Sequence, residues 1–378
     1  MGKTVDLIVV TGEPSGDAHG QKLTQKLQQR RPDLQIAAVG GDFLRQESIE
    51  LIFPMERLQT MGFFDLIPSL PKIAYWFFFL RKKILALNPK GVVFIDYPGF
   101  NLRLQRSLRK KGYKGKLIQY ICPSVWAWSK GRIPLMEQSL DLLLTIFPFE
   151  EALFQNSPLE ARYVGNPSYE EISIHESRKK KGGSWEKHAK GPLLALFPGS
   201  RKKEIYRNFP LQILAAKEVS ATPVVSCAKK EHEPLLRSIM EQNHFSAEIV
   251  RGDRRHDLMQ SADMAIATSG TVTLELALFG TPTLVTFAIP TKDYLFAAKC
   301  LRIDLPFYCI VNILENAPIF PELFGPNLTP ARVKYWAKHW LSNEERRKDC
   351  KENLKTLQNR LGKRGKTAEE AILFEIGV

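Results

Sequence analysis

Short apolar runs alternate with longer segments of mixed polarity along most of the chain. In the first half these runs cover residues 5–10, 36–39, 91–95, 117–121, 142–146 and 161–164. Strands that alternate with helical segments form parallel sheets, because a crossover returns the chain to the starting edge after each strand. The pattern therefore predicts an α/β domain built on a doubly wound parallel sheet.

The second half repeats this rhythm, with apolar runs at residues 193–197, 222–226, 247–251, 264–267 and 283–287. Between the halves, residues 173–190 are polar, as in an interdomain linker. The sequence after residue 330 is highly charged and favours helices. We predict Rossmann-like domains over residues 1–172 and 191–345, joined by a linker over 173–190. Residues 346–378 are predicted to form helices that pack back on the first domain.

Composition narrows the class of protein. The chain has 378 residues, enough for two domains, and a formal net charge of +14, which predicts an anionic partner. Nucleic acid, an acidic membrane surface and phosphorylated substrates all fit that charge. The five cysteines are odd in number and lack C-x-x-C spacing, which argues against disulfides or a zinc knuckle and favours a reducing, cytoplasmic location.

One apolar segment, residues 73–80, is flanked by Lys72 and by the basic residues 81–83. It is far shorter than the roughly 20 residues that span a bilayer. The apolar stretch near the N-terminus is also too short for a signal peptide, because a polar loop follows it at residue 12. We therefore predict a chain that does not cross a membrane but can lie on one. Its candidate contacts with a membrane or acyl chains are Trp76, Phe77, Phe78 and Phe79.

Two loops carry most of the chemical signal: residues 12–17 (Gly-Glu-Pro-Ser-Gly-Asp) and 198–201 (Pro-Gly-Ser-Arg). Each follows an apolar run and precedes a predicted helix, an arrangement that exposes backbone N–H groups to a phosphate or a sugar hydroxyl. One loop opens each half, which predicts two domains facing across a cleft and a nucleotide-type ligand.

Three carboxylates are candidates for acid–base chemistry. Glu13 and Asp17 lie in the first loop, where Gly12 and Gly16 free the backbone to turn. The alternative there is an ordinary helix cap by Ser15 or Asp17. Asp96 ends the strand at residues 91–95 and can act as a general base on a hydroxyl, or it can simply cap the next helix.

The loop at residues 198–201 places a cation, Arg201, at a predicted helix start, and Glu204 follows at the spacing of a capping box. Residues 267–275 (Ala-Thr-Ser-Gly-Thr-Val-Thr-Leu-Glu) form a second strand–turn–helix unit. Two helix N-termini would then converge on one pyrophosphate, with Glu275 accepting hydrogen bonds from ribose hydroxyls. The alternative is two ordinary capped helices.

The sequence lacks the motifs of several common enzyme chemistries. There is no G-x-G-x-x-G, no Walker lysine, no paired-aspartate metal motif and no H-E-x-x-H. We therefore expect neither a nicotinamide dehydrogenase nor a resident metal or other cofactor. The loop Ser124-Val125-Trp126-Ala127-Trp128 is unusually aromatic, and core packing explains it as well as ligand contact does.

Taken in order, these motifs resemble those of the lipid A disaccharide synthases. The matching residues are 12–17, 95–101 (Ile-Asp-Tyr-Pro-Gly-Phe-Asn), 123–128 (Pro-Ser-Val-Trp-Ala-Trp), 147–150 (Phe-Pro-Phe-Glu), 198–201 and 269–275. The resemblance implies a GT-B glycosyltransferase that is cytoplasmic and peripherally associated with the inner membrane. It would transfer 2,3-diacylglucosamine from UDP-2,3-diacylglucosamine to the 6-hydroxyl of 2,3-diacylglucosamine 1-phosphate, with inversion to a β(1→6) disaccharide and release of UDP.

The resemblance also implies roles for residues and partners. Asp96 would be the base, with Glu13 and Asp17 as rivals. The UDP-sugar would bind Gly199, Ser200, Arg201, Glu204, Ser269, Gly270, Thr271, Thr273 and Glu275. The acceptor would meet Gly12, Ser15, Gly16, Asn101, Ser124, Trp126 and Asn312. An anionic membrane surface is an expected partner, and nucleic acid is not. Whether the chain forms a homodimer is left undecided.

Three positions depart from the commoner family pattern: Gly99, Asn166 and residues 315–318 (Glu-Asn-Ala-Pro). A second hypothesis is another GT-B transferase that uses UDP-N-acetylglucosamine on a polyprenyl or soluble acceptor. A third is a basic nucleic-acid-binding protein, which is weak because aromatic and basic residues do not interleave on a known RNA-binding motif.

Overall fold

The computed structural model describes residues 4–47, 49–58, 66–126, 130–178, 191–252, 254–290 and 305–378. The chain divides into two compact units, and each is described by itself. Unit 1 is Met1–Pro167 together with Lys363–Val378, and unit 2 is Ser168–Gly362.

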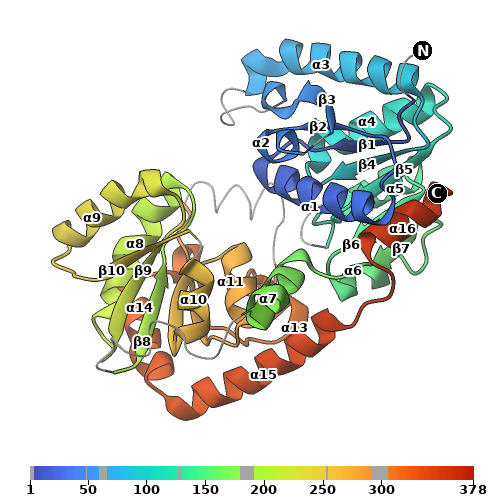
Figure 1. Ribbon diagram of the computed structural model, residues 1–378. Helices are drawn as coiled ribbons and strands as arrows, with labels where there is room; N and C mark the ends of the chain where they lie inside the picture. Colours follow the sequence, from blue (N-terminus) through green and yellow to red (C-terminus); the bar gives the residue numbers. More distant parts are fainter. Residues whose placement is uncertain are drawn as a thin grey trace. The chain divides into compact units, whose positions relative to one another are not determined.

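Unit 1 contains a parallel sheet, which has seven strands in the described residues, in the order β3-β2-β1-β4-β5-β6-β7 (Figure 1). The strands are β1 (Leu7–Val10), β2 (Ile36–Gly40), β3 (Glu50–Pro54), β4 (Gly91–Ile95), β5 (Lys116–Tyr120), β6 (Leu142–Thr145) and β7 (Glu160–Tyr163). Strand order runs one way from β1 to β3 and the other way from β4 to β7. The topological switch point, where ligands bind in such sheets, therefore lies between β1 and β4.

Helices cover both faces of this sheet, because alternate residues of a strand point to opposite sides. Ile8 and Val10 pack in a core with residues of α3 (Leu66–Leu87), α4 (Pro98–Lys110) and α5 (Ile133–Glu137). Leu7 and Val9 pack in the opposite core with α1 (Pro14–Arg30), α2 (Asp42–Arg45) and α16 (Ala368–Glu375). A short α6 (Pro148–Ala152) follows β6.

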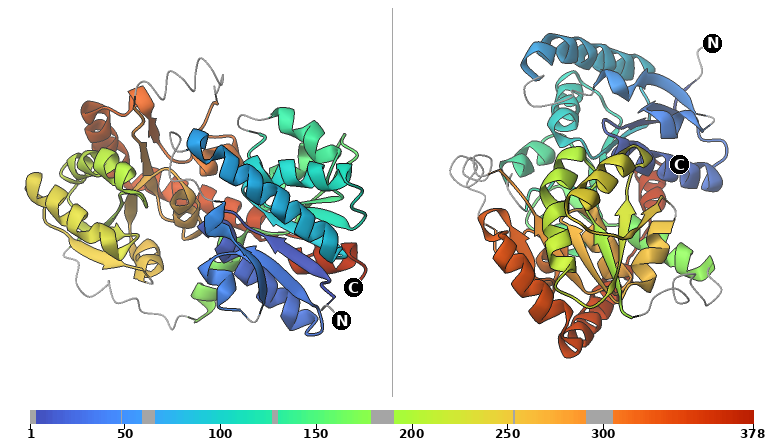
Figure 2. Two further views of the ribbon diagram at one scale, coloured as in Figure 1. Left: turned by 90° about the horizontal axis from the view of Figure 1, so that it is seen from above. Right: turned by 90° about the vertical axis from the view of Figure 1, so that its left-hand side faces the viewer.

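The C-terminal helix α16 belongs to unit 1 and lies beside α1, although the two come from opposite ends of the chain (Figures 1 and 2). Arg30 on α1 pairs with Glu370 at 2.9 Å, and Lys116 at the start of β5 pairs with Glu375 at 2.7 Å. Buried Ala371 and Ile372 complete the core on this face.

Unit 2 has a second parallel sheet, with six strands in the described residues, in the order β10-β9-β8-β11-β12-β13. These are β8 (Leu193–Phe197), β9 (Thr222–Cys227), β10 (Glu248–Arg251), β11 (Met264–Thr268), β12 (Thr283–Phe287) and β13 (Glu322–Phe324). Its switch point lies between β8 and β11. Alternate residues of β8 pack in one core with α10 (Arg254–Ser261) and α11 (Thr271–Leu278).

In the described residues, unit 2 also contains the helices α7 (Pro167–Arg178), α8 (Lys202–Ala216), α9 (Glu233–Gln242), α13 (Ile310–Glu315), α14 (Pro330–Trp336) and α15 (Glu344–Gly362). Single turns η1 (Met55–Arg57), η2 (Lys130–Arg132), η3 (Lys230–His232) and η4 (Gly325–Asn327) are 3-10 helices, and η5 (Ala337–Leu341) is a π-helix. Within the described part of the chain, no helix is both long and apolar enough to span a membrane.

The predicted pair of doubly wound α/β domains is confirmed. Two segments differ from the sequence prediction. Helix α7 runs through residues 173–178, where a linker was expected, and residues 179–190 lie outside the described residues. Helix α15 belongs to unit 2, because its buried Leu354 and Leu357 face that unit and Gln358 donates to the Leu278 carbonyl of α11. Only the segment from Lys363 onward returns to unit 1.

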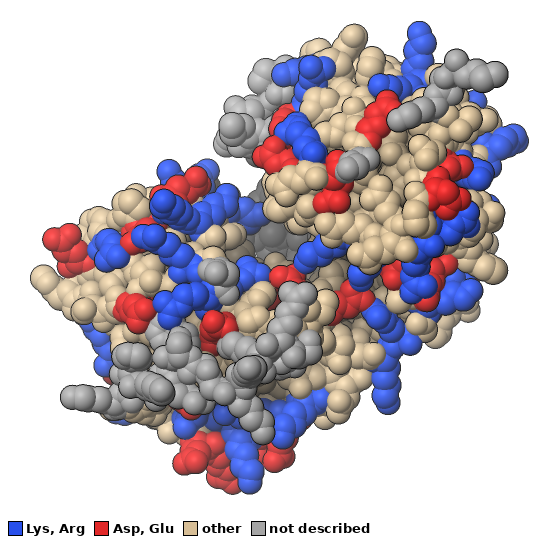
Figure 3. All heavy atoms as spheres, viewed as in Figure 1, with Lys and Arg blue, Asp and Glu red and all other residues tan. Residues whose placement is uncertain are grey.

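Lys and Arg are interspersed with Asp and Glu on the face shown in Figure 3. The excess of positive charge therefore does not gather into one continuous basic area on this face.

Candidate active site

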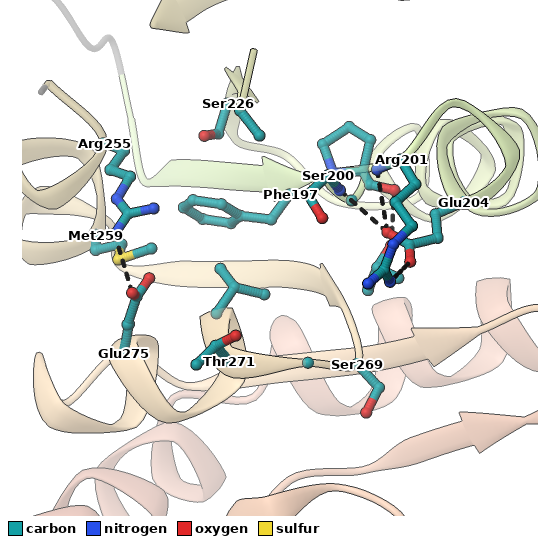
Figure 4. Close-up of a pocket in the computed structure, with 16 residues that line it drawn as sticks. Phe197, Ser200, Arg201, Glu204, Ser226, Arg255, Met259, Ser269, Thr271 and Glu275 are labelled. Carbon is teal, nitrogen blue, oxygen red and sulfur yellow. Dashed lines mark hydrogen bonds and ion pairs between the residues drawn. The ribbon is translucent and has the colours of Figure 1, made fainter. Parts of the chain in front are cut away.

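A pocket of about 250 Å³ opens at the switch point of unit 2. Its walls are the loop after β8, the loop after β11 and side chains of α10 (Figure 4). Phe197, Met259 and Val272 form apolar lining, while Ser200, Arg201, Ser269, Thr271 and Glu275 add polar groups. The two loops that the sequence singled out in this half are thus brought together around one cavity.

Arg201 and Glu204 form a capping box at the start of α8. The backbone N–H groups of Ser200 and Arg201 donate to Glu204 Oε2 at 3.1 and 3.3 Å, and Arg201 Nη1 lies 2.7 Å from Glu204 Oε1. Glu204 therefore shapes the loop and occupies two amides that were expected to bind a ligand. The Arg201 side chain is 80% exposed and remains accessible to an anion.

Gly199 fits this loop for a steric reason. Its φ of 118° is a conformation that side chains disfavour, and an added Cβ would lie 2.9 Å from Glu204 Cβ.

The N-terminus of α11 supplies the opposite wall. Ser269, Gly270 and Thr271 line the pocket there, and a helix N-terminus favours negative charge. Thr273, which was expected among the ligand-binding residues, is fully buried, and its hydroxyl donates to the Gly270 carbonyl at 2.7 Å. Its role is to hold the turn.

Arg255 is a pocket residue that sequence reasoning missed. It lies on α10, and its Nη2 atom is 3.0 Å from Glu275 Oε1, so that the pair closes one side of the pocket (Figure 4). Arg255 follows β10 at the start of α10 but belongs to no motif. The basic stretch at residues 251–255 was the one available signal.

The buried side-chain amide of Gln212 connects the strand ends beside the pocket. Gln212 Nε2 donates to the Phe197 carbonyl and to the hydroxyls of Thr268 and Thr286, each at 3.2 Å. The Thr268 hydroxyl in turn donates to the Pro198 carbonyl at 2.9 Å. These bonds fix the ends of β8, β11 and β12 relative to each other.

The switch point of unit 1 joins the loops after β1 and β4. Glu13 and Ser15 are exposed at the start of α1. Gly12 lies under the Tyr97 ring and Gly16 lies against the Ile95 carbonyl, so that both glycines permit close packing. The pKa of the Tyr97 hydroxyl is raised by burial and by the negative charge of Glu13. The loop that carries Glu13 and the segment after β4 are neighbours, because Gly12 packs against the Tyr97 ring.

Asp96 and Asp17, two of the three candidate bases, have different surroundings. Asp96 is half-buried, and burial raises the pKa of its carboxyl, although a hydrogen bond from the Tyr97 backbone opposes the shift. Asp17 is fully buried, and its two oxygens accept the backbone N–H groups of Gly41 at 2.8 Å and Phe43 at 2.9 Å. Asp17 is therefore a structural carboxylate rather than a rival base.

Glu150 is a second residue whose chemistry the sequence did not reveal. Its side chain is buried after β6 and accepts the backbone N–H groups of Ile146 and Phe147 at 3.2 and 3.1 Å. Burial raises the pKa of Glu150 to about 8, while these bonds and one from the Trp126 side chain oppose the shift. The pKa of the nearby Cys122 thiol is raised mainly by burial and further by the negative charge of ionised Glu150.

The aromatic loop after β5 is partly described. Ser124 is exposed, and Trp126 packs edge-on against Phe149 with ring centroids 5.7 Å apart. Trp126 therefore covers the buried Glu150 region. Trp128 lies outside the described residues.

Asn312, expected near an acceptor, is fully buried in unit 2. Its side chain donates to the Phe320 carbonyl at 2.7 Å and accepts the Phe320 N–H at 2.8 Å. This pair of bonds gives Asn312 a structural role, because it holds α13 to the segment before β13.

The four apolar candidates on α3 divide into two sets. Trp76 packs against Phe53 with ring centroids 5.1 Å apart, and Phe77 packs against Phe100 at 5.6 Å, so that both join the core of unit 1. Phe78 is 53% exposed and Phe79 is 39% exposed, and the neighbouring Tyr75 reaches 61%. The exposed surface is thus Tyr75, Phe78 and Phe79, which we call the α3 aromatic patch.

Comparison with known proteins decides the family. The family model described as Lipid-A-disaccharide synthetase matches residues 7–376. The chain belongs to the lipid-A-disaccharide synthetase family. Lipid-A-disaccharide synthase from Chlamydia trachomatis serovar D is 38% identical over 84% of this chain, and the Azotobacter vinelandii protein of the same name is 32% identical over 87%.

Coverage of these relatives differs. The chain spans 53% of the Chlamydia trachomatis protein and 61% of the Chlamydia pneumoniae one, but 88% of the Azotobacter vinelandii one. The chain thus spans little more than half the length of its chlamydial relatives in the lipid-A-disaccharide synthetase family.

Solved structures share the fold of this family member at low sequence identity. Staphylococcus aureus MnaA, solved with UDP, is 14% identical with a TM-score of 0.61, covering 96% of this chain and 99% of that one. MurG from Acinetobacter baumannii is 12% identical with a TM-score of 0.60, covering 99% of both chains. The expected GT-B fold, with its two Rossmann-like domains, is confirmed.

Proposed function

We propose that this chain is a lipid A disaccharide synthase. It transfers 2,3-diacylglucosamine from UDP-2,3-diacylglucosamine to the 6-hydroxyl of 2,3-diacylglucosamine 1-phosphate, forming a β(1→6) disaccharide and UDP. The observation that carries this proposal is the pocket between the loops after β8 and β11, in a chain of this family.

The pocket suits the UDP part of the donor. Its apolar lining and its helix N-terminus match a nucleotide with a diphosphate. The exposed Arg201 guanidinium would stabilise charge that develops on the pyrophosphate as the glycosidic bond breaks. Glu275, held by Arg255 at 3.0 Å, would accept hydrogen bonds from ribose hydroxyls. Staphylococcus aureus MnaA, which shares the fold, was solved with UDP, and this supports a UDP-type ligand for this chain.

Asp96 is the base in this proposal. Its carboxylate takes the proton from the acceptor 6-hydroxyl, and the oxygen attacks the anomeric carbon as the bond to UDP breaks with inversion. UDP leaves with the bonding electrons. A raised pKa makes the Asp96 carboxylate a stronger base than an ordinary aspartate. Glu13 remains the rival, since it lies by the same switch point.

The α3 aromatic patch would lie against an anionic membrane or the acyl chains of the substrates. The Arg81 guanidinium lies 4.9 Å from the Phe78 ring centroid, so that a cation accompanies the apolar surface. Exposed aromatic rings beside basic residues are typical of helices that bind membrane interfaces. We propose peripheral association with the cytoplasmic face of the inner membrane on this basis.

Mass spectrometry of the products tests the reaction. The purified protein is offered both acylated substrates, and a tetraacyl disaccharide phosphate together with UDP is expected. UDP-N-acetylglucosamine and a non-acylated acceptor serve as controls. Absence of the tetraacyl product would overturn the proposal, and turnover of UDP-N-acetylglucosamine alone would favour another GT-B transferase.

A further inference from the structure

Two neighbouring strands of unit 1 end in backbone conformations that ordinary residues avoid. Asp96 and Tyr97, after β4, have φ of 49° and 48°, and Ile121, after β5, has φ of 71°. Positive φ is uncommon for non-glycine residues and unusual for a β-branched one such as Ile121. Such a conformation is unfavourable and persists only where the surroundings hold it.

Buried side-chain amides hold these residues. Asn101 Nδ2 donates to the Asp96 carbonyl at 2.7 Å. Gln119 Nε2 lies 3.4 Å from the same carbonyl and 3.2 Å from the Ile121 carbonyl. Gln105 Nε2 donates to Gln119 Oε1 at 2.8 Å, which orients the Gln119 amide. We call Asn101, Gln105 and Gln119 the amide clamp.

Asn101 and Gln119 donate to backbone carbonyls, and Gln105 supports them through the Gln119 side chain. The three side chains of the amide clamp are fully buried. Within the described part of the chain, Asn101 Oδ1 has no hydrogen-bond partner, so this side chain acts as a donor alone. Both of its bonds go to the end of β4, because the second reaches the Ile95 carbonyl at 3.4 Å.

We propose that Asn101 and Gln119 are positioning residues for Asp96. By holding the Asp96 carbonyl, they fix a left-handed turn that the residue would otherwise leave, and the turn sets where its carboxyl points. This inference rests on the proposed function, in which Asp96 is the base. It replaces the expected contact between Asn101 and the acceptor with an indirect role, because the buried amide is already bonded to backbone.

A double-mutant cycle tests this role. Asn101→Ala is expected to lower kcat about 10- to 100-fold, since misplacing a catalytic group by about 1 Å can cost that much. UDP affinity should stay within about twofold, because the UDP pocket lies in unit 2. In an Asp96→Asn background the same substitution should cost less than about threefold, because the group that it positions is no longer active.

Controls separate positioning from general damage. Ser139→Ala removes a partly buried hydrogen bond to the Leu135 carbonyl elsewhere in unit 1 and should leave kcat unchanged. If Asn101→Ala does not fold, Gln119→Met, which is similar in volume, enters the same cycle. Wild-type kcat in the Asn101 variant, or an equal loss in both backgrounds, overturns the inference. A wild-type protein that forms no product overturns the proposed function instead.

Discussion

The Tyr97 ring covers Gly12 so closely that a Cβ atom added to Gly12 would lie 2.1 Å from Tyr97 Cδ1. The Tyr97 hydroxyl also donates to the Leu58 carbonyl at 3.0 Å, which limits how far the ring can move. This contact locks the loop after β1 to the loop after β4 across the switch point of unit 1.

Gly12→Ala is therefore expected to lower both stability and turnover. Overpacking of this kind costs about 1–3 kcal/mol, and the displaced ring would pull on the backbone of Asp96. Thermal melting and steady-state kinetics measure the two effects. Gly99→Ala is the matched control for stability, because a Cβ there meets nothing within 4 Å. Equal melting temperatures for the two variants would refute the steric argument.

Asp96→Asn should lower kcat about 100- to 10,000-fold, the usual cost of losing a general base, and leave UDP affinity intact. In the wild type, activity should fall as pH decreases through the pKa of Asp96, because only the ionised form accepts a proton. Since burial raises that pKa, the loss of activity on the acid side of the pH profile should occur at a higher pH than the pKa of an ordinary aspartate. Near-normal kcat in the variant would make Glu13 the leading candidate.

Arg201→Ala should weaken UDP binding by about 1.5–3 kcal/mol, the worth of a hydrogen bond to a charged group. The donor should lose the same amount, because the pyrophosphate is common to both. Calorimetry with UDP measures this directly. Lys203→Ala, an exposed cation on the same helix that does not line the pocket, is the control. Equal affinities for both variants would place the pyrophosphate away from Arg201.

Glu150→Gln should change how stability depends on pH. The folded-state pKa of Glu150 is about 8, above its unfolded value of about 4.3. The folded state therefore holds a proton that the unfolded state has lost, and wild-type stability falls as pH rises between these values, by at most about 1.4 kcal/mol per pH unit. Gln keeps an acceptor without titrating. Melting temperatures at pH 5 and 8 should thus converge in the variant, and parallel curves would contradict the prediction.

Replacing Tyr75 and Phe78 by serine should release the protein from anionic vesicles and raise the apparent KM for the acylated acceptor. The melting temperature should change little, because both rings are mostly exposed. Trp76→Ser is the contrasting variant and should lower the melting temperature, since this ring packs on Phe53. Co-sedimentation that survives the double substitution would argue against the α3 aromatic patch as the membrane contact.

The strands that the apolar pattern missed are both at sheet edges. β3 and β13 each have one neighbour, and their residues are mixed in burial rather than continuously buried. Central strands are covered on both faces and therefore read as apolar runs. Edge position alone does not hide a strand, because β7 and β10 are also edge strands and were predicted from apolar runs. β13 has only three residues, too few for an apolar run to stand out.

The candidate site shows a similar division. Asp96 and Arg201 were found because they lie in short motifs at the ends of parallel strands, and such strand ends meet at one edge of the sheet. Arg255 also follows a strand but was missed because it belongs to no motif. Glu150 lies in the quoted motif 147–150 but was given no role, because only its burial reveals its chemistry. Asp17 and Asn312 were assigned to ligands on residue type, but their hydrogen bonds go to backbone. Sequence gives the chemistry of a side chain and not its partners.

The C-terminal helix α16 completes one core of unit 1 from the far end of the chain. Unit 1 is therefore not encoded by one contiguous stretch of the gene. A fragment that stops at residue 167 would lack Ala371 and Ile372 and would leave part of one apolar sheet face uncovered. An isolated unit 1 must have the segment from Lys363 grafted onto its end, and a chimaera that exchanges unit 2 with a relative needs two junctions rather than one.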